Sequence, residues 1–202
     1  MGNRPIRLND VVLASHLVFM GYGHWLPDDP RGSGSSEIRK PELKDLGEIH
    51  FGRKEDQPTR DELRAFFREG EPLLDHPLIW FNEQMRQSVA CAFAQTIRDR
   101  GYTVWECAIL KNHAHLVVRT HKTDRSEDIW QHFADDAAKS LRQFLNIGAN
   151  HPIWSDRPYK VFLKSHAAVE TRIGYVQRNP QKEGLTRQNW DFVAACPWIK
   201  SW

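Results

Sequence analysis

Two short apolar runs, separated by a polar bend, constrain the fold more than any other part of this sequence. Tyr102–Leu110 and Ala114–Thr120 are rich in aliphatic, β-branched and aromatic residues, a composition typical of buried strands. Lys111, Asn112 and His113 lie between them. Because a connection this short joins antiparallel neighbours, the sequence predicts a β-hairpin over residues 102–120.

Five further segments show the periodicity of regular structure. Apolar residues at helical spacing predict three helices, and aliphatic and aromatic runs predict a first and a last strand. The predicted strands are Val11–Met20 and His151–Leu163, and the predicted helices are Leu78–Arg100, Ser126–Leu145 and Ala167–Arg178, with Pro180 expected to end the last helix. The resulting βαββαβ order is that of the ferredoxin-like split βαβ arrangement. We therefore expect an α+β fold, with an antiparallel sheet, helices on one face and an additional C-terminal helix.

A long segment interrupts this pattern after the first strand. Prolines, glycines and charged residues recur through residues 24–77, and a segment of this length is usually functional or partly disordered. Thr59 and Glu62 match a capping box, which predicts a short helix over Thr59–Glu69. We interpret the segment as an insertion within a single domain that spans residues 1–202.

A histidine pair stands at the start of the second hairpin strand. His113 and His115 flank Ala114, and Leu116 and Val117 follow directly. Residues two apart on a strand point to the same face, so both imidazoles can approach one point. Such a pair is often plain polar surface. Here the apolar run that follows indicates a buried strand, where unpaired imidazoles are costly, and this favours a shared metal ion.

A second candidate group lies near the end of the last predicted helix. Tyr175 and Asn179 are four residues apart and therefore share one helix face. Taken singly, Tyr175 is typical of amphipathic packing, and Asn179 before Pro180 is typical of a helix end. Taken with the histidine pair, two imidazoles and an amide oxygen make three ligands for a divalent ion with a tyrosine one turn away.

These motifs together resemble those of the single-tyrosine HUH transposases, close to the REP-associated tyrosine transposases. HUH denotes histidine, a bulky apolar residue and histidine, and Ala114 is small for the middle position. The family's second motif resembles Tyr-Ile-x-x-Asn-Pro, a basic residue and Gly-Leu. It reads here Tyr175-Val176-Gln177-Arg178-Asn179-Pro180, followed by Lys182 and Gly184-Leu185. The segment from Trp154 to Phe162 is also similar, so the resemblance covers about residues 11–20 and 79–190 and leaves the insertion unmatched.

The resemblance implies a metal-dependent transposase or endonuclease that cleaves and rejoins single-stranded DNA. His113, His115 and Asn179 would hold Mg²⁺, with Mn²⁺ able to substitute, although imidazole ligands alone would suit Zn²⁺ as well. Tyr175 would attack the scissile phosphate, leaving a 5′-phosphotyrosine and a free 3′-hydroxyl. A phenol ionises near pH 10, and the sequence identifies no general base for it.

DNA binding is less localised in the sequence. The net charge is +2 and the sequence pI is about 8.5, which permits nucleic-acid binding without requiring it. The candidate DNA-binding residues are Arg178 and Lys182 beside the tyrosine motif, and Arg31 and Arg53 in the insertion. Acidic residues are interspersed in the insertion, so solvated surface charge is the alternative. The expected partner is single-stranded or hairpin DNA, and the sequence leaves monomer and homodimer open.

Composition also bears on the cellular compartment. Cys91, Cys107 and Cys196 are widely spaced and odd in number, which predicts reduced thiols. No apolar run is long enough to cross a bilayer, and we see no signal peptide. We therefore expect a cytoplasmic protein, and the resemblance to the transposases implies a prokaryotic cell and association with the nucleoid.

Three other functions deserve comparison with the transposase. A domesticated, catalytically silent protein that binds hairpin DNA would not need the intact motif residues. An RNA-binding sheet would need exposed aromatic residues, which Leu116–Val118 lacks. A zinc hydrolase would need a general base, and no carboxylate adjoins the histidine pair in sequence. His16, His121 and His166 lie outside both motifs, and we predict packing or surface roles for them.

Overall fold

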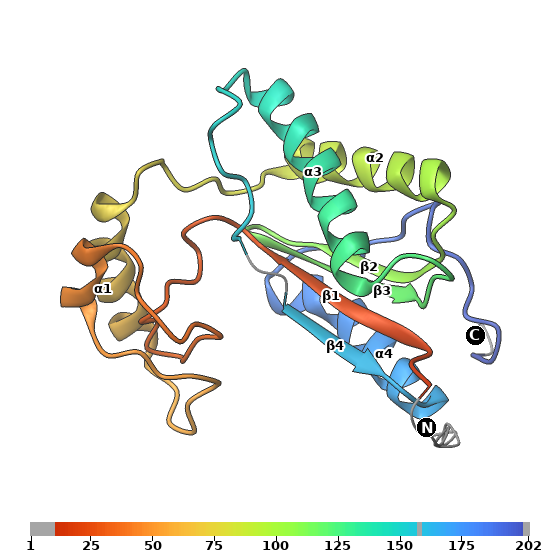
Figure 1. Cartoon of the computed structure of the whole chain (residues 1–202), viewed down its shortest axis with the longest axis horizontal. Helices are drawn as coiled ribbons and strands as arrows, with labels where there is room; N and C mark the ends of the chain where they lie inside the picture. Colours follow the sequence, from red (N-terminus) through yellow and green to blue (C-terminus); the bar gives the residue numbers. More distant parts are fainter. Residues whose placement is uncertain (1–10, 157–158, 200–202) are drawn as a thin grey trace, which may run out of the picture.

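The computed structural model describes residues 11–156 and 159–199 and contains one four-stranded antiparallel sheet (Figure 1). The strands are β1 (Ala14–Met20), β2 (Val104–Ile109), β3 (His113–Arg119) and β4 (Tyr159–Leu163). The helices are η2 (Pro41–Leu46), α1 (Arg60–Gly70), η3 (Glu71–Leu73), α2 (Glu83–Arg100), α3 (Ser126–Leu145) and α4 (His166–Lys182). The strand order β2-β3-β1-β4 confirms the predicted ferredoxin-like fold and its hairpin.

Two predicted boundaries were wrong near tight backbone contacts. The helix predicted over Leu78–Arg100 begins at Glu83. The side chain of Asn82 accepts a hydrogen bond from the Met85 N–H and so caps the helix there. Just before it, the Phe81 N–H donates to the Lys111 carbonyl at 2.6 Å. The last predicted strand begins at Tyr159 and not at His151. Trp154 forms an isolated bridge with Gly21, and residues 157–158 lie outside the described part of the chain.

The prediction that Pro180 ends the last helix was also wrong, since α4 continues to Lys182. A proline lacks the N–H that would donate to the carbonyl four residues earlier. In the last turn this removes a single bond. The Pro180 carbonyl still accepts hydrogen bonds from the N–H groups of Glu183 at 3.1 Å and Leu185 at 2.8 Å.

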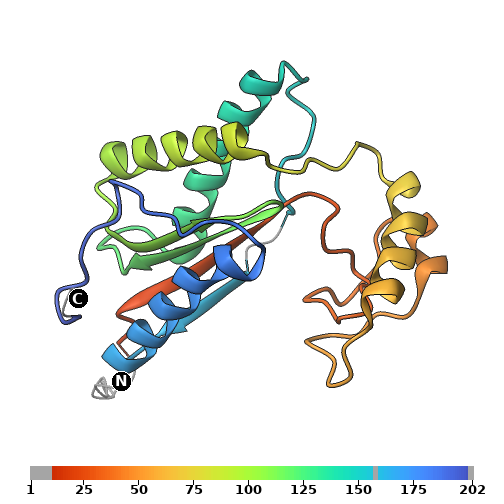
Figure 2. The same cartoon turned by 180° about the vertical axis from the view of Figure 1, so that it is seen from behind.

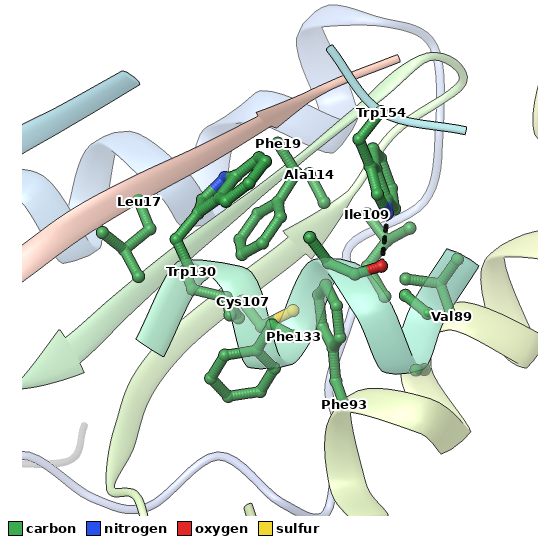
Figure 3. Packing of buried hydrophobic residues seen from close by; sticks show 14 of the residues in the cluster. Leu17, Phe19, Val89, Phe93, Cys107, Ile109, Ala114, Trp130, Phe133 and Trp154 are labelled. Carbon is green, nitrogen blue, oxygen red and sulfur yellow. Dashed lines mark hydrogen bonds between the residues drawn. The ribbon is translucent and has the colours of Figure 1, made fainter. Parts of the chain in front are cut away.

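Helices α2 and α3 cover one face of the sheet, which we call the helix-pair face (Figure 1). Its strand residues are apolar, with Leu17 and Phe19 from β1 and Leu116 from β3 fully buried. Phe93 of α2 and Phe133 of α3 pack edge to face at 5.1 Å between ring centroids. Figure 3 shows this core, in which Trp154 donates its indole N–H to the carbonyl of Ala134 on α3. The main hydrophobic core therefore lies here.

Helix α4 crosses the opposite face, which we call the α4 face (Figure 2). Its apolar residues are fewer: Ala14, Val117, Leu163, Val169, Ile173 and Val176 are among them. Buried polar side chains share this face with them. Alternation along β1 and β3 directs His16, His113 and His115 toward α4, while their neighbours face the helix pair.

The insertion forms a lobe beside the end of β1 (Figures 1 and 2). Its small core contains Leu26, Leu43 and Phe66. The predicted capping box is confirmed, because the Thr59 side chain accepts from the Glu62 N–H and the Glu62 side chain accepts from the Thr59 N–H. Helix α1 therefore starts where the sequence predicted.

The segment after α4 runs along the free edge of β2. The Gln188 side chain accepts a hydrogen bond from the Ile109 N–H at 2.8 Å and donates one to its carbonyl at 2.7 Å. The Ala194 N–H donates to the Val104 carbonyl at 2.8 Å. These bonds protect an otherwise open sheet edge. None of the helices in the described part of the chain combines the length and apolar character needed to cross a membrane.

Candidate metal and tyrosine site

The histidine pair lies on the α4 face at the start of β3. The antiparallel register pairs His113 with Met20 and His115 with Val18 on β1. The two imidazole rings have centroids 4.9 Å apart and stand nearly perpendicular, at 84°. The strand therefore brings both side chains to one region, as their spacing predicted.

His113 lies at the more accessible edge of the group. Its Nδ1 is 2.8 Å from Asn112 Oδ1, and an amide oxygen accepts, so Nδ1 carries the proton and donates it. Its Nε2 then keeps a free lone pair. Glu183 Oε1 is 3.8 Å from the same Nδ1. Burial, with smaller contributions from nearby His24 and Arg31, lowers the pKa of His113 to about 4.

His115 lies deeper in the same group. Its Nδ1 is 2.9 Å from Nε2 of His16 on β1, in a fully buried contact. Its other nitrogen, Nε2, is buried and has no hydrogen-bond partner among the described residues. Burial lowers the pKa of His115 well below its usual value, with His113, His16 and Arg172 adding to the effect. A buried, unpaired ring nitrogen is costly unless another group satisfies it.

Tyr175 of α4 lies over the deeper imidazoles. Its ring centroid is 5.9 Å from that of His115 and 6.1 Å from that of His16, both edge-on. Two cations flank the ring, with Lys182 Nζ 4.9 Å and the Arg172 guanidinium carbon 5.3 Å from its centroid. About a third of the tyrosine remains exposed, at 36%. Its phenol is thus open to solvent beside two positive charges.

Asn179 follows Tyr175 by one turn on the same helix face. The turn before it contacts His115 through Tyr175, and the turn after it approaches His113 through Glu183. Along the chain, Asn179 lies between the two residues that make these contacts. The residue is buried, and its Nδ2 has no hydrogen-bond partner among the described residues. Rotation of the amide about its last bond would present Oδ1 to the same place.

The donor set fits a divalent ion with open coordination positions. Two neutral imidazoles and an amide oxygen are acceptable ligands, and two buried nitrogens of this set have no hydrogen-bond partner in the described part of the chain. Within residues 11–156 and 159–199, no three or more His, Cys, Asp or Glu side chains are grouped to hold a metal. Three such side chains would be typical of a catalytic zinc site, which keeps its fourth position open. The set here has only two and depends on the amide for its third ligand.

The four residues predicted to bind DNA fall into two groups. Arg178 and Lys182 are exposed on α4, beside Tyr175. Arg31 is instead held within the insertion, by two contacts of 2.6 and 2.8 Å to the Asp29 carboxylate and by stacking on Trp25. Arg53 is exposed in the insertion. The cations nearest the tyrosine are therefore those of α4.

Sequence reasoning missed three residues of this group. His16, predicted to have a packing or surface role, contacts His115; the polar residue inside the apolar run of β1 was the available signal. Arg172 is three residues before Tyr175 on α4, and Glu183, the C-cap of α4, is four residues after Asn179. Helical spacing would have found both of them. His121 bonds with Thr123, and His166 stacks on Trp198, as packing roles would require.

Comparison with known proteins gives structural neighbours alone. No protein-family model and no curated protein matches the chain. A solved REP-associated tyrosine transposase bound to a REP hairpin aligns with 13% sequence identity and a TM-score of 0.45, covering 95% of this chain and 81% of that one. A putative transposase from Deinococcus radiodurans R1 aligns with 8% identity and a TM-score of 0.37, covering 88% of this chain and 96% of that one.

Proposed function

We propose that this protein is a metal-dependent transposase-type enzyme that cleaves and rejoins single-stranded DNA through a covalent tyrosine intermediate. One observation carries the proposal. The Tyr175 ring of α4 packs edge-on against the buried His115 ring of β3, and among the described residues neither His115 Nε2 nor Asn179 Nδ2, one turn after the tyrosine, has a hydrogen-bond partner. A candidate nucleophile beside a buried imidazole with an unsatisfied nitrogen supports an active-site assignment.

The covalent step assigned to Tyr175 is a phosphoryl transfer. The tyrosine oxygen would attack phosphorus as its phenol proton leaves, forming an O–P bond. The bond from phosphorus to the 3′-oxygen would break, and that oxygen would take up a proton. The products are a 5′-phosphotyrosine and a free 3′-hydroxyl. Because the ester linkage is kept, a 3′-hydroxyl from another strand can reverse the step and join to the same phosphate.

The ligand set assigned to the ion is His113, His115 and Asn179. Mg²⁺ is the proposed ion, with Mn²⁺ able to substitute. Once bound, a divalent ion polarises a phosphate oxygen and neutralises developing charge. The protein's own part is to hold both imidazoles neutral, which their burial favours, and to keep the tyrosine one helical turn from the amide ligand.

Single-stranded or hairpin DNA is the proposed substrate. A phosphate within reach of the Tyr175 oxygen would also lie near Lys182 and Arg172, the two cations beside its ring. Arg178 is exposed on the same helix. Cations at these positions would bind the phosphate backbone without reading its sequence.

The direct test is a denaturing-gel assay for a protein–DNA adduct. The protein is mixed with a pool of labelled hairpin and linear single-stranded DNAs, with Mg²⁺, Mn²⁺ or a chelator. We expect an adduct that needs metal, disappears in Tyr175→Phe and persists in Tyr159→Phe. Tyr159 is the matched control because it is a more exposed tyrosine, at 60%, on the edge strand β4. Binding without an adduct, in every metal, would instead indicate a catalytically silent hairpin-binding protein.

A hydrolase is a second candidate, favoured by a single contact. Sequence reasoning found no carboxylate beside the histidine pair, yet Glu183 Oε1 lies 3.8 Å from His113 Nδ1. Burial raises the pKa of Glu183, which is the direction expected for a carboxylate that takes up a proton near neutral pH. The same gel separates the two functions. Cleaved DNA without an adduct, lost in Glu183→Gln and kept in Tyr175→Phe, would support water as the nucleophile.

A further inference from the structure

His16 connects the candidate metal site to the arginine beside the nucleophile. Its Nε2 is 2.9 Å from His115 Nδ1, and its Nδ1 is 3.3 Å from an Nη1 of Arg172. The His16 side chain is 1% exposed. The three residues come from β1, β3 and α4, so this chain of contacts exists only in the folded protein.

The contact with Arg172 determines where the ring protons lie. A guanidinium donates and never accepts, so His16 Nδ1 must offer its lone pair. A neutral imidazole carries one proton, which then sits on His16 Nε2 and is donated to His115 Nδ1. His115 Nδ1 accepts, and its own proton consequently lies on Nε2.

With its proton on Nε2, His115 cannot bind a metal ion through that nitrogen. A metal ion needs the lone pair of a ring nitrogen, and Nε2 is the His115 nitrogen that has no hydrogen-bond partner among the described residues. His113 provides the contrast. Its Nδ1–H donates to Asn112 Oδ1 at 2.8 Å, which leaves its Nε2 with a lone pair. One histidine of the pair is ready for a metal ion, and the other is held in the opposite tautomer.

We propose that His16 is a positioning residue that sets the tautomer of His115, and that Arg172 holds it in the form that cannot bind metal until DNA phosphate draws the guanidinium away. This inference rests on the proposed function. When Arg172 leaves, one proton departs from His115 Nε2 and another is taken up at His16 Nδ1. The shared proton shifts from His16 Nε2 to His115 Nδ1, so each ring still carries one proton.

DNA is the natural competitor for this arginine. The Arg172 guanidinium lies 5.3 Å from the Tyr175 ring centroid, where a phosphate must come for attack. A charge-assisted bond from guanidinium to phosphate is stronger than its 3.3 Å contact with a neutral imidazole. Metal and DNA would therefore bind with positive coupling, each raising the affinity for the other.

The first experiment observes the tautomers directly, without metal. Long-range ¹⁵N–¹H spectra of histidine-labelled protein report which ring nitrogen is protonated. We expect both His16 and His115 to carry the proton on Nε2 in the metal-free wild type. In Arg172→Met, or after addition of diamagnetic Mg²⁺ with a single-stranded DNA, His115 should carry it on Nδ1. A proton on His115 Nδ1 in the metal-free wild type would overturn the proposal.

The second experiment measures Mn²⁺ affinity by calorimetry or by the EPR signal of free Mn²⁺. Partners of metal ligands typically change affinity by about 10- to 100-fold. We expect Arg172→Met to bind Mn²⁺ about ten times more tightly than wild type in the absence of DNA. Arg178→Met is the matched control, since it removes the same charge from the same helix. An equal increase in Mn²⁺ affinity in both variants would mean that the loss of one positive charge explains the effect, and it would contradict the proposal.

A third variant separates positioning from packing. His16→Phe removes the ring nitrogen that bonds His115 and leaves its tautomer unset, whereas His16→Gln can accept from His115 Nδ1–H and should bind Mn²⁺ more tightly than His16→Phe. Equal Mn²⁺ affinity in these two variants would count against the positioning role. If no variant binds Mn²⁺ while the tautomers still change with Arg172, the metal-dependent function fails and the role of His16 and Arg172 in setting the tautomer is supported.

Discussion

The two faces of the sheet bury different kinds of side chain, although the same strands form both. On the helix-pair face, β1 and β3 contribute Leu17, Phe19 and Leu116 to a core made mainly of aliphatic and aromatic side chains. On the α4 face, the alternate positions of these strands carry His16 and His115, both buried. Since successive residues point to opposite sides, a single strand supplies both environments.

This difference shows where stability and chemistry are separated in the molecule. The helix-pair face buries large aromatic side chains and should supply most of the hydrophobic free energy of folding. On the α4 face, two buried nitrogens have no hydrogen-bond partner among residues 11–156 and 159–199, which is unfavourable for folding. Unsatisfied buried polar groups of this kind are typical of functional sites, and the well-packed opposite face offsets their destabilising effect.

The largest effect should come from truncating the helix-pair face. Phe133 is fully buried between Phe93 and Tyr102, with ring centroids 5.1 and 5.7 Å away. Phe133→Ala should lower the free energy of unfolding by about 3–5 kcal/mol, because it removes buried area and leaves a cavity. Urea denaturation measures this. A loss below about 1 kcal/mol would mean that this face is not the stabilising one.

Metal should stabilise the other face by mass action. At a Mn²⁺ concentration 100 times its Kd, binding to the folded state alone adds about 2.7 kcal/mol. Thermal unfolding with and without Mn²⁺ measures this gain, which we expect to vanish in His113→Ala. His121→Ala is the control, because His121 lies in a loop outside the site, and this variant should keep the stabilisation by Mn²⁺. A full gain in His113→Ala would remove this residue from the ligand set.

Acid should affect the α4 face selectively in the metal-free protein. Burial, aided by Arg172, lowers the pKa of His16 from 6.5 to about 3, so the unfolded chain binds this proton first. The contribution of His16 to stability is therefore complete above pH 6.5 and declines as pH falls from there toward 3. The loss is about 1.4 kcal/mol per pH unit for one imidazole.

His16→Gln isolates this contribution, because the amide does not titrate. The dependence of unfolding free energy on pH between 6 and 4 should become shallower by about 1.4 kcal/mol per unit. At pH 8 His16 is neutral in both the folded and the unfolded chain. The difference in unfolding free energy between wild type and His16→Gln at this pH therefore measures the change in packing. The same slope in both proteins would show that His16 takes up a proton in the folded state as readily as in the unfolded chain.

The smallest effect should come from the outer surface of α4. Lys182 lies beside Tyr175 and is exposed. Lys182→Met should weaken binding to all single-stranded DNA sequences about equally and lower the magnitude of the salt slope by roughly one counterion. Fluorescence anisotropy at several salt concentrations measures both. A change that depends on DNA sequence would instead indicate base recognition by Lys182.

Most of the fold was predictable from local sequence patterns. The errors lie where a single contact sets the boundary of a helix or strand. Apolar spacing located α3 to the residue, and Thr59 with Glu62 located the start of α1. The start of α2 depended on the Asn82 cap and on a bond from Phe81 to the hairpin bend. Periodicity carries no information about such contacts, so that boundary was missed.

The sequence by itself determined the two halves of the candidate site. Residues two apart on a strand and four apart on a helix must share a face, so the pairs His113–His115 and Tyr175–Asn179 follow from backbone geometry. Tertiary structure alone decided that the two halves meet, and that His16 and Arg172 join them. His16 lies 99 residues from His115 and 156 residues from Arg172 along the chain. Contacts over such separations depend on strand register and helix packing, and the side chains that set the state of His115 became identifiable only in the folded protein.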